Sequence, residues 1–475
     1  NAALGIHHSE SDGYFNRNVS AIGLTPCRSS NQHPAGIMAR PGVILPILQN
    51  WSCHNCGGCC REHQIVVTAE EKQRIEKQNW TANDGVAADR PLIVIQGKDF
   101  RLNHQGDGAC VFLDEKGLCR IHAKFGEAAK PLACRVYPYA VHPSGNSVTV
   151  SLRFSCPSVV QNLGQPVAQQ RQTLEELAKQ IVPANYKAPD APQLRKGVPL
   201  GWPDVMRLLA FIERGLADEK VSFATRLLRV LSWIELLEQS PPSAISEDQL
   251  GSLLPLLHEA SVRAQPNDEL PVVKPSRLGR IMFRQWVAQL LRHDTDVTAK
   301  QGAAGRMRLL SDGVRFTMGW GRIPAVADPI SVRVAFSALS KESDDNTPAG
   351  SMPTFSQLEV EFCGRNTEFN EVLTRYYRVK LQGLHFCGRA FYDMPFIEGF
   401  RSLALMYPAT MWVARMRAAR DGRGQISLTD VQAALATIDH NFGYSPVLGM
   451  KSSQTRIQQL AKMEQITALC SWYSR

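Results

Sequence analysis

The sequence predicts an α+β protein in which a small cysteine-rich domain with short strands is followed by a larger all-α domain. Most of the 12 cysteines lie between Cys53 and Cys156, and short runs of β-branched residues occur in the same stretch. From Asp204 onward, apolar residues recur at the spacing of helices. A chain of 475 residues is long enough to form several domains.

Residues 1–50 are rich in Gly, Pro, Asn and Ser, which predicts an extended N-terminal arm. The sequence does not open with a basic segment followed by an apolar one, so we expect no secretion signal. No apolar run approaches the roughly 18 residues that a membrane-spanning helix needs. We therefore expect a cytoplasmic protein that does not cross a membrane.

Residues 51–160 form the predicted cysteine-rich domain. Its predicted strands are QIVV (64–67), LIVI (92–95), ACVFL (109–113) and VTVSLRF (148–154). A short helix is predicted over 69–78, with Thr68 as its N-cap. The result is a small α+β unit with long loops.

Residues 161–202 are polar and contain several prolines, which predicts a linker with one short helix at about 168–181. Residues 203–475 are predicted to form the all-α domain, interrupted by a polar stretch near 322–352. Its helical patterns cover 204–216, 223–239, 248–260, 280–293, 370–384, 400–419, 429–442 and 455–469.

Eight cysteines make up the candidate metal site: Cys53, Cys56, Cys59, Cys60, Cys110, Cys119, Cys134 and Cys156. Four thiolates satisfy Zn²⁺ in a tetrahedral site, or hold an iron–sulfur cluster. The C-x₂-C-x₂-C spacing lets a tight turn aim sulfurs at one ion, and Gly57-Gly58 allow that turn to close. Eight thiols match two four-coordinate sites, or one cluster with spare cysteines.

Two other interpretations of the cysteines compete with metal binding. Disulfides within 53–60 are disfavoured because their geometry is exacting and no secretion signal is expected. Buried free thiols are the other alternative, since Cys is among the most buried residue types. His122, at Cys119-x₂-His122, is the best candidate for a histidine ligand in place of a cysteine.

The order and spacing of four strings give the chain a family resemblance. The strings are CHNCGGCC (53–60), GACVFLDEKGLCRIH (108–122), KPLACRVYP (130–138) and FSCP (154–157). Over 51–160 the chain resembles the CxxCxxCC cysteine-cluster family, also called YkgJ-like, a zinc- or iron-chelating domain. The resemblance implies that the cysteines from Cys53 to Cys134 named above are metal ligands, with Cys156 at the last, more variable position.

The same domain is found in flagellin lysine-N-methylases, so the resemblance also implies an iron–sulfur cluster and S-adenosylmethionine. In those bacterial enzymes a long helical region follows the cysteines, and RYYRVKLQGLHF (375–386) and LALMYP (403–408) resemble it. The residues themselves show neither a G-x-G-x-x-G loop nor a C-x₃-C-x₂-C motif. If S-adenosylmethionine binds, an open coordination position on the cluster is the plausible place.

Two functions therefore remain open. The first is a lysine-N-methylase-like enzyme that modifies a lysine-bearing protein substrate, with catalytic residues still unidentified. The second is a non-enzymatic protein whose zinc-stapled domain supports a helical binding scaffold. In either case, we read Arg120, Lys130, Arg135, Tyr137 and Tyr139 as ordinary residues around the cysteines, or as groups that tune the cluster or bind an anion.

The net charge is +9, and much of the excess lies between Lys274 and Arg322. This stretch is interpreted as a solvated surface, or as a patch for an acidic partner. Arg277, Arg280 and Arg284 fall on one helix face. Nucleic acid is not expected as a partner, because no aromatic stacking pattern or nucleic-acid motif accompanies these charges.

Three further patterns in the helical part do not point to a site. Its aromatic residues at helical spacing are interpreted as core rather than as a lysine-binding cage: Tyr376, Tyr377, Phe386, Phe391, Tyr392 and Trp412. DGRGQISLTD (421–430) resembles part of a calcium loop, but Ala419 and Arg423 stand where two of the carboxylates would be needed. It therefore predicts a helix junction, with Ser427 and Asp430 as a capping box. Cys363 and Cys387 each precede Gly-Arg, a recurrence that the sequence does not explain.

Overall fold

The computed structural model describes residues 42–87, 90–183, 185–245, 247–291, 303–324, 352–362 and 367–475. Most of the predicted arm at 1–50 and of the polar stretch at 322–352 lies outside these residues. Strands are confined to Gly42–Leu152, and the described residues beyond them are mostly helical. The predicted α+β class, with a cysteine-rich part followed by a helical part, is confirmed.

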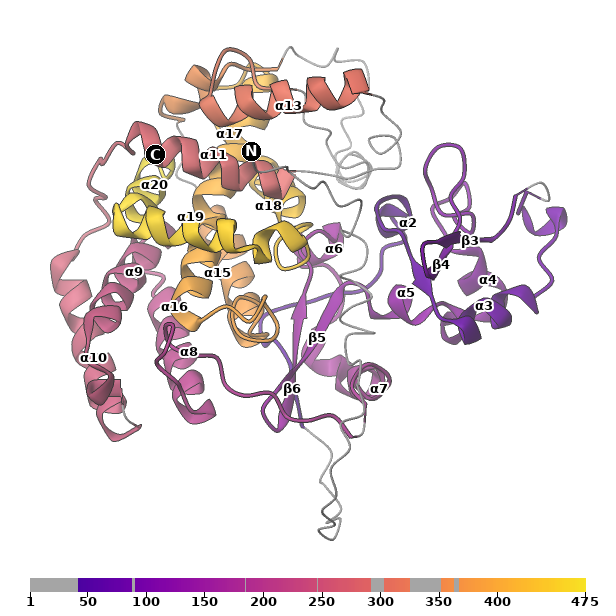
Figure 1. Ribbon diagram of the computed structural model, residues 1–475, viewed down its shortest axis with the longest axis horizontal. Coiled ribbons are helices and arrows are strands. Elements are labelled where there is room, and N and C mark those ends of the chain that lie inside the picture. Colours follow the sequence, from indigo (N-terminus) through magenta and orange to yellow (C-terminus); the bar gives the residue numbers. More distant parts are fainter. Residues whose placement is uncertain are drawn as a thin grey trace, which may run out of the picture.

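Residues 53–136, here called the cysteine lobe, project from one side of the molecule (Figure 1). A three-stranded antiparallel sheet has the order β2-β4-β3, from Val66–Val67, Asp99–Leu102 and Ile93–Gln96. Short helices surround it: α2 (Gly58–Glu62), α3 (Ala69–Glu76), α4 (Arg120–Phe125) and α5 (Leu132–Val136). The lobe has its own hydrophobic core of Ile65, Val67, Ile75, Val86, Leu102, Cys110, Val111, Phe112 and Ile121.

Helix α3 begins where the sequence predicts. The Thr68 hydroxyl accepts the Glu71 N–H at 3.2 Å, and the Glu71 carboxylate accepts the Thr68 N–H at 2.9 Å. This reciprocal pair satisfies two N–H groups that the helix itself leaves unpaired. The second Glu71 oxygen accepts the Leu132 N–H at 2.6 Å, so the same carboxylate ties α3 to α5.

The strand predicted over 109–113 is wrong. Cys110 and Leu113 form only isolated bridges, to His104 and Cys119. The chain turns there, because the Leu113 N–H bonds to the Cys110 carbonyl at 2.9 Å. The predicted strands at 64–67, 92–95 and 148–154 are present as β2, β3 and β6, each displaced by one or two residues.

A second sheet has the order β1-β6-β5 and belongs to a different core. β1 (Gly42–Ile44) pairs parallel to β6 (Ser147–Leu152), and β5 (Tyr139–Ser144) pairs antiparallel to it. Val148, Val150 and Leu152 are buried in the same hydrophobic cluster as the helices. The predicted division at residue 160 stays a prediction; in the packing, residues 139–160 join the helical body rather than the lobe.

The helical body is formed by the rest of the described chain (Figure 1). Its helices are α6 (Pro157–Val160), α7 (Arg171–Ile181), α8 (Trp202–Leu216), α9 (Phe223–Gln239), α10 (Glu247–Ala264), α11 (Arg277–Leu291), α13 (Ala303–Met318), α15 (Thr367–Gln382), α16 (Phe396–Ala404), α17 (Met406–Arg420), α18 (Leu428–Asp439), α19 (Lys451–Lys462) and α20 (Gln465–Tyr473). Short 3₁₀ turns occur at Ala82–Asp84, Glu127–Ala129, Val167–Gln170, Pro242–Ile245, Phe355–Glu359 and Pro446–Gly449.

Three helical predictions need adjustment. The pattern at 400–419 divides at Leu405 into α16 and α17, since Pro408 is tolerated only in the first turn of a helix. The pattern at 455–469 divides where Glu464 adopts a left-handed backbone with φ 56°. Helix α13 was not predicted. Ser427 and Asp430 form the predicted capping box of α18, with the Asp430 N–H bonded to the Ser427 hydroxyl at 3.2 Å.

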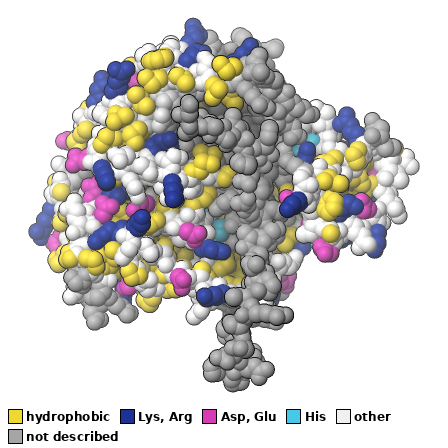
Figure 2. Space-filling view, in the orientation of Figure 1, with side chains coloured by type: hydrophobic (Ala, Val, Ile, Leu, Met, Phe, Trp, Pro, Cys, Tyr) yellow, Lys and Arg dark blue, Asp and Glu magenta, His cyan; other side chains and the backbone are white. Residues whose placement is uncertain are grey.

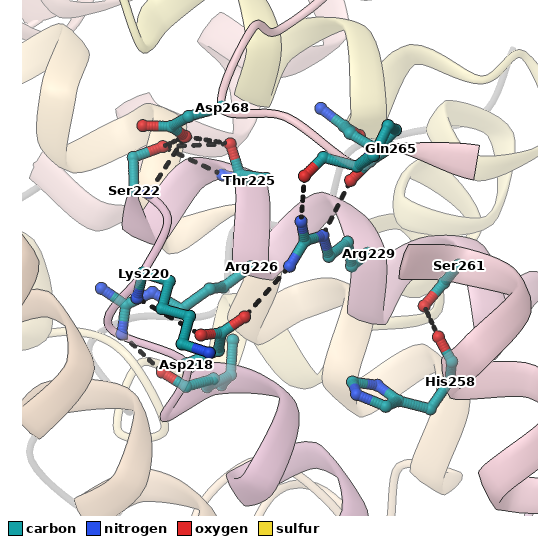
Figure 3. A network of polar contacts seen from close by, with 12 residues as sticks. Asp218, Lys220, Ser222, Thr225, Arg226, Arg229, His258, Ser261, Gln265 and Asp268 are labelled. Carbon is teal, nitrogen blue, oxygen red and sulfur yellow. Dashed lines mark hydrogen bonds and ion pairs between the residues drawn. The ribbon is translucent and has the colours of Figure 1, made fainter. Parts of the chain in front are cut away.

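Polar contacts close the loops of the body onto its helices (Figure 3). The Asp268 carboxylate accepts the Ser222 N–H at 3.0 Å and the Ser222 and Thr225 hydroxyls at 2.5 Å each, at the start of α9. Arg229 donates to the carbonyls of Gln265 and Pro266 at 3.0 and 3.2 Å. These bonds hold the segment after α10 against α9, and we assign them a structural role.

On the face that Figure 2 shows, Lys and Arg are scattered among acidic and apolar side chains (Figure 2). Whether the basic stretch at 274–322 is a solvated surface or a patch for an acidic partner stays a prediction, and its residues 292–302 lie outside the described residues. Arg284 is buried, and its guanidinium donates to the carbonyls of Thr317 and Met318 at 2.9 and 3.1 Å, at the end of α13. It is therefore not part of a surface patch. Within the described residues, no helix is long and apolar enough to cross a membrane.

Candidate metal centre

Half of the eight candidate ligands lie in, or directly before, the first turns of short helices in the lobe. Cys59 and Cys60 lie in α2, Cys119 is the N-cap residue of α4, and Cys134 lies in α5. Cys110 is part of the lobe core, and Cys60, Cys119 and Cys134 pack against that core. The local folding of the lobe therefore turns cysteines from distant segments toward one region.

Close backbone contacts bring the first two cysteine segments together. The Cys110 N–H bonds to the Cys60 carbonyl at 2.7 Å. Gly57 has a left-handed backbone with φ 67°, as the predicted turn requires. Gly117 also has a positive φ, 79°, and a Cβ placed there would lie 2.8 Å from the Asn55 carbonyl oxygen. The loop before Cys119 can therefore approach the loop before Cys56 only because residue 117 is glycine.

The sulfur atoms interact without forming covalent pairs. The Sγ atoms of Cys59 and Cys60 are 4.0 Å apart, about twice the length of a disulfide bond. All described cysteines are free. Cys59 is within electrostatic reach of Cys56, Cys60, Cys110, Cys134 and Cys156. Cys56 also interacts electrostatically with Cys53, and Cys110 with Cys119, so a chain of electrostatic interactions links all eight predicted residues.

Burial keeps most of these thiols protonated in the absence of a cation. It raises the pKa of Cys110 and of Cys156 to about 12 each. Burial also raises the pKa of Cys56 and Cys134. For Cys59 the hydrogen bond with Cys60 is the largest cause of its raised pKa, and burial is the second. A bound metal ion supplies the charge that lets such thiols ionise.

Several neighbours favour the ionised form. Lys130 lowers the pKa of both Cys59 and Cys134 through its charge. Backbone N–H groups also donate to three sulfurs, which lowers their pKa. The donors are Gly58 to Cys56, Phe112 to Cys110 and Val159 to Cys156. Such donors are the outer partners that thiolate ligands of metals commonly have.

The cysteines lie in one region, but their side chains are not arranged as a coordination shell. In the part of the chain that the structure describes, no group of three or more Cys, His, Asp or Glu side chains is spaced to hold a metal ion. His122, the predicted histidine alternative, is exposed on α4. The assignment of the eight cysteines as ligands stays a prediction that the free, mutually interacting thiols support.

Of the five flanking residues that the sequence suggested, Lys130 and Tyr137 lie beside the thiols. Burial raises the pKa of Tyr137 well above its usual range, and the charge of Cys156 adds to this. Arg120 donates to the Asp84 carbonyl at 3.2 Å. Arg135 and Tyr139 donate to Gln180 at 3.0 Å and to Gln170 at 2.7 Å. These three side chains bind protein groups outside the cysteine cluster.

Arg153 was not foreseen by the sequence analysis. Its guanidinium lies 3.9 Å from the centre of the Tyr444 ring and 5.5 Å from that of Tyr137. It also donates to the His440 carbonyl at 3.0 Å. His440 stacks on His63 with ring centroids 5.1 Å apart. A cation at the end of an otherwise uncharged predicted strand, three residues before Cys156, was the available signal.

Five of the six aromatic residues that were interpreted as core are core, and Tyr392 is only partly buried and packs against that core. Tyr376, Tyr377, Phe386 and Trp412 are fully buried, and Phe391 is nearly so. Cys387 is buried against α16, where a Cβ on Gly399 would lie 3.1 Å from the Cys387 Cβ. The close approach accounts for glycine at 399, and Cys387 itself is a buried residue of the core. Cys363 lies outside the described residues.

Comparison with known proteins finds a family match over the cysteine segment. Residues 52–157 match the CxxCxxCC family, described as "Putative zinc- or iron-chelating domain". This match confirms the resemblance drawn from the cysteine strings.

Three curated relatives from Salmonella also match. "Lysine-N-methylase" of Salmonella choleraesuis (strain SC-B67) is 27% identical over 112 residues, 22% of this chain and 27% of the relative. "Lysine-N-methylase" of Salmonella typhimurium (strain LT2) is 26% identical with the same coverage. "Flagellar biosynthetic protein FliU" of Salmonella muenchen is 38% identical over 56 residues, 12% of this chain and 33% of the relative. The matches thus span about a quarter to a third of each relative, and no solved structure matches.

Proposed function

We propose that the cysteine lobe, together with Cys156, holds a zinc or iron centre through thiolates. One observation carries this proposal: free thiols from separated segments meet in one region of a segment that matches a zinc- or iron-chelating domain. The residues fit such a centre chemically, because none of the thiols is in a disulfide, all but Cys53 are at least partly buried, and three of them accept backbone N–H groups. Without a cation, ionising several of them together would be strongly unfavourable.

We further propose that the chain is a lysine-N-methylase-like enzyme with a protein lysine as its methyl acceptor. Two relatives that match over the cysteine segment carry the name Lysine-N-methylase. An iron–sulfur cluster with one open position would supply a place for the amino and carboxylate groups of S-adenosylmethionine. The chain's own contribution would be to hold the cluster, with the charge of Lys130 beside Cys59 and Cys134.

The second candidate is a non-enzymatic protein in which the metal only stabilises the lobe, here called the staple, and the small size of the lobe favours it. The lobe core consists of nine buried side chains, a small number for a unit that projects from the body. Small cores commonly depend on a metal or on disulfides for stability. In that case a zinc ion would stabilise the lobe, and the helical body would bind a partner.

Anaerobic purification with metal analysis separates the two candidates. The methylase proposal expects brown protein that contains iron and sulfide, with a visible spectrum that changes when S-adenosylmethionine is added. Colourless protein with stoichiometric zinc and no response to S-adenosylmethionine would favour the staple. Protein that binds neither metal after reconstitution would contradict both.

A further inference from the structure

The last candidate ligand, Cys156, belongs to a different packing unit from the lobe cysteines. Its side chain is part of the hydrophobic core of the helical body, whereas Cys110 belongs to the core of the lobe. Yet Cys156 lies within electrostatic reach of Cys56 and Cys59. Residues 152–160, here called the Cys156 arm, therefore extend from the body toward the lobe cysteines.

Helix α15 fixes the C-terminal end of the Cys156 arm. The buried guanidinium of Arg375 donates to the carbonyls of Val159 and Val160 at 2.8 and 2.6 Å. These are the last residues of α6, and the Val159 carbonyl also accepts the Asn162 N–H at 3.0 Å and the Gln49 side-chain amide at 3.0 Å. The same guanidinium donates to the Gln49 side chain at 2.9 Å, just before the first cysteine segment.

A buried ion pair fixes the N-terminal end of the arm. Lys380 and Asp439 are both fully buried, with Nζ and Oδ1 2.8 Å apart. Lys380 also donates to the Leu152 carbonyl at 3.2 Å, and Asp439 accepts the Phe154 N–H at 2.6 Å. Tyr376 donates to the same carboxylate at 3.0 Å. Both charges of the pair are thus bonded to the backbone that leads into Cys156.

The other side of the arm contacts the cysteine segments. The Ser158 hydroxyl is 3.1 Å from Nδ1 of His54, which follows Cys53 in the chain. The Ser155 hydroxyl is 3.3 Å from the Tyr137 hydroxyl, which lies just after α5. The arm therefore has body residues on one side and residues next to candidate ligands on the other.

We propose that the metal centre is shared between lobe and body, with Lys380 and Asp439 as positioning residues for Cys156. This inference rests on the proposed metal centre and goes beyond it. Binding of the metal would tie the lobe to the helical body, and the buried ion pair would hold the body's ligand in place. Partners of metal ligands of this kind typically contribute about 10- to 100-fold in metal affinity.

The first test uses the unmodified full chain and Co²⁺ as the only metal. Hydrogen exchange is compared with and without Co²⁺ for peptides from the lobe and from residues 153–160. We expect Co²⁺ to slow exchange in both. Slower exchange in the lobe alone would overturn the shared centre, and this test needs no variant to fold.

The second test removes the ion pair without changing the net charge. We expect the double variant Lys380→Met with Asp439→Asn to weaken Co²⁺ binding about 10- to 100-fold and to lower the thiolate-to-cobalt absorption per bound ion. We expect Cys156→Ser to lower that absorption in the same way. The matched control is Arg401→Met with Glu238→Gln, which removes another ion pair of the body, at 2.7 Å between α16 and α9. The control should bind Co²⁺ within about threefold of the parent, because its effects on the arm are at most indirect.

The outcomes separate the two proposals. A folded Lys380 and Asp439 variant with parental Co²⁺ affinity would overturn the positioning role. Parental absorption in Cys156→Ser, alongside a loss in Cys59→Ser, would place the centre wholly in the lobe and overturn the shared site only. No thiolate-to-cobalt absorption in the parent would overturn the proposed metal centre itself.

Discussion

Arg375 is the residue whose loss we expect to destabilise the protein most clearly, and the variant is Arg375→Met. Its guanidinium makes three hydrogen bonds, to Gln49, Val159 and Val160. Hydrogen bonds to a charged group are worth about 1.5–3 kcal/mol each, so three give roughly 4–9 kcal/mol. Burial of the charge opposes this.

The cost of that burial follows from the pKa of Arg375, which burial lowers from 12.5 to about 10. At about 1.4 kcal/mol per pKa unit, keeping the guanidinium charged costs roughly 3 kcal/mol. The difference predicts that Arg375→Met loses about 3 kcal/mol in the free energy of unfolding. The Val159 carbonyl keeps the Asn162 N–H and the Gln49 side-chain amide as donors, so any added cost of an unpaired group falls on the buried Val160 carbonyl.

Urea unfolding measures this loss, and Arg378→Met is the matched control. Arg378 lies on the same helix but is only half-buried, and its charge acts on Glu213. A partly exposed ion pair is worth about 1 kcal/mol or less. Equal destabilisation by the two substitutions would refute the claim that Arg375 clamps the arm.

Three further predictions concern pH, a loop contact and a helix cap. Burial lowers the pKa of His142 to about 4, so as pH falls below 6.5 the unfolded chain is protonated at this histidine before the folded chain is. Between pH 6.5 and 5 the parent should therefore lose about 2 kcal/mol of unfolding free energy that His142→Gln does not lose. An equal fall with pH in the unfolding free energies of both proteins, measured in urea, would contradict this. Gly117→Ala should weaken Co²⁺ binding at least tenfold, because the added Cβ meets the Asn55 carbonyl. Gly97→Ala is the control: Gly97 also has a positive φ, 63°, but a Cβ there meets only open space, so this variant should bind Co²⁺ normally. Equal Co²⁺ affinities of the two variants would argue against a role for the contact. Thr68→Ala should lower the free energy of unfolding by about 1 kcal/mol, because it removes the cap of α3. Hydrogen exchange in the first turn of α3 should become faster, and unchanged exchange would show that the cap does not stabilise the helix.

Features that depend on neighbours in sequence could be predicted. Thr68 and Ser427 cap their helices with partners three residues away, and both caps were predicted correctly. The cysteine spacing likewise identified the segment that matches a zinc- or iron-chelating domain. The strand at 109–113 failed because β-propensity does not show where a chain turns back on itself.

Features that depend on distant partners could not be predicted. Arg375 and Lys380 were noticed only as part of a string that resembles a family's helical tail. Their roles follow from bonds to Val159 and to Asp439, which lie far away in the sequence. The periodicity of α15 indicates which face is buried, but not that two cations on that face bind the backbone on either side of Cys156.

X-ray absorption at the metal edge of the anaerobically isolated full chain tests the central claim most directly. The account predicts sulfur neighbours at about 2.3 Å around zinc or iron, and fewer of them in Cys156→Ser. A metal surrounded only by nitrogen and oxygen, or protein that stays metal-free after reconstitution with its cysteines reduced, would contradict it.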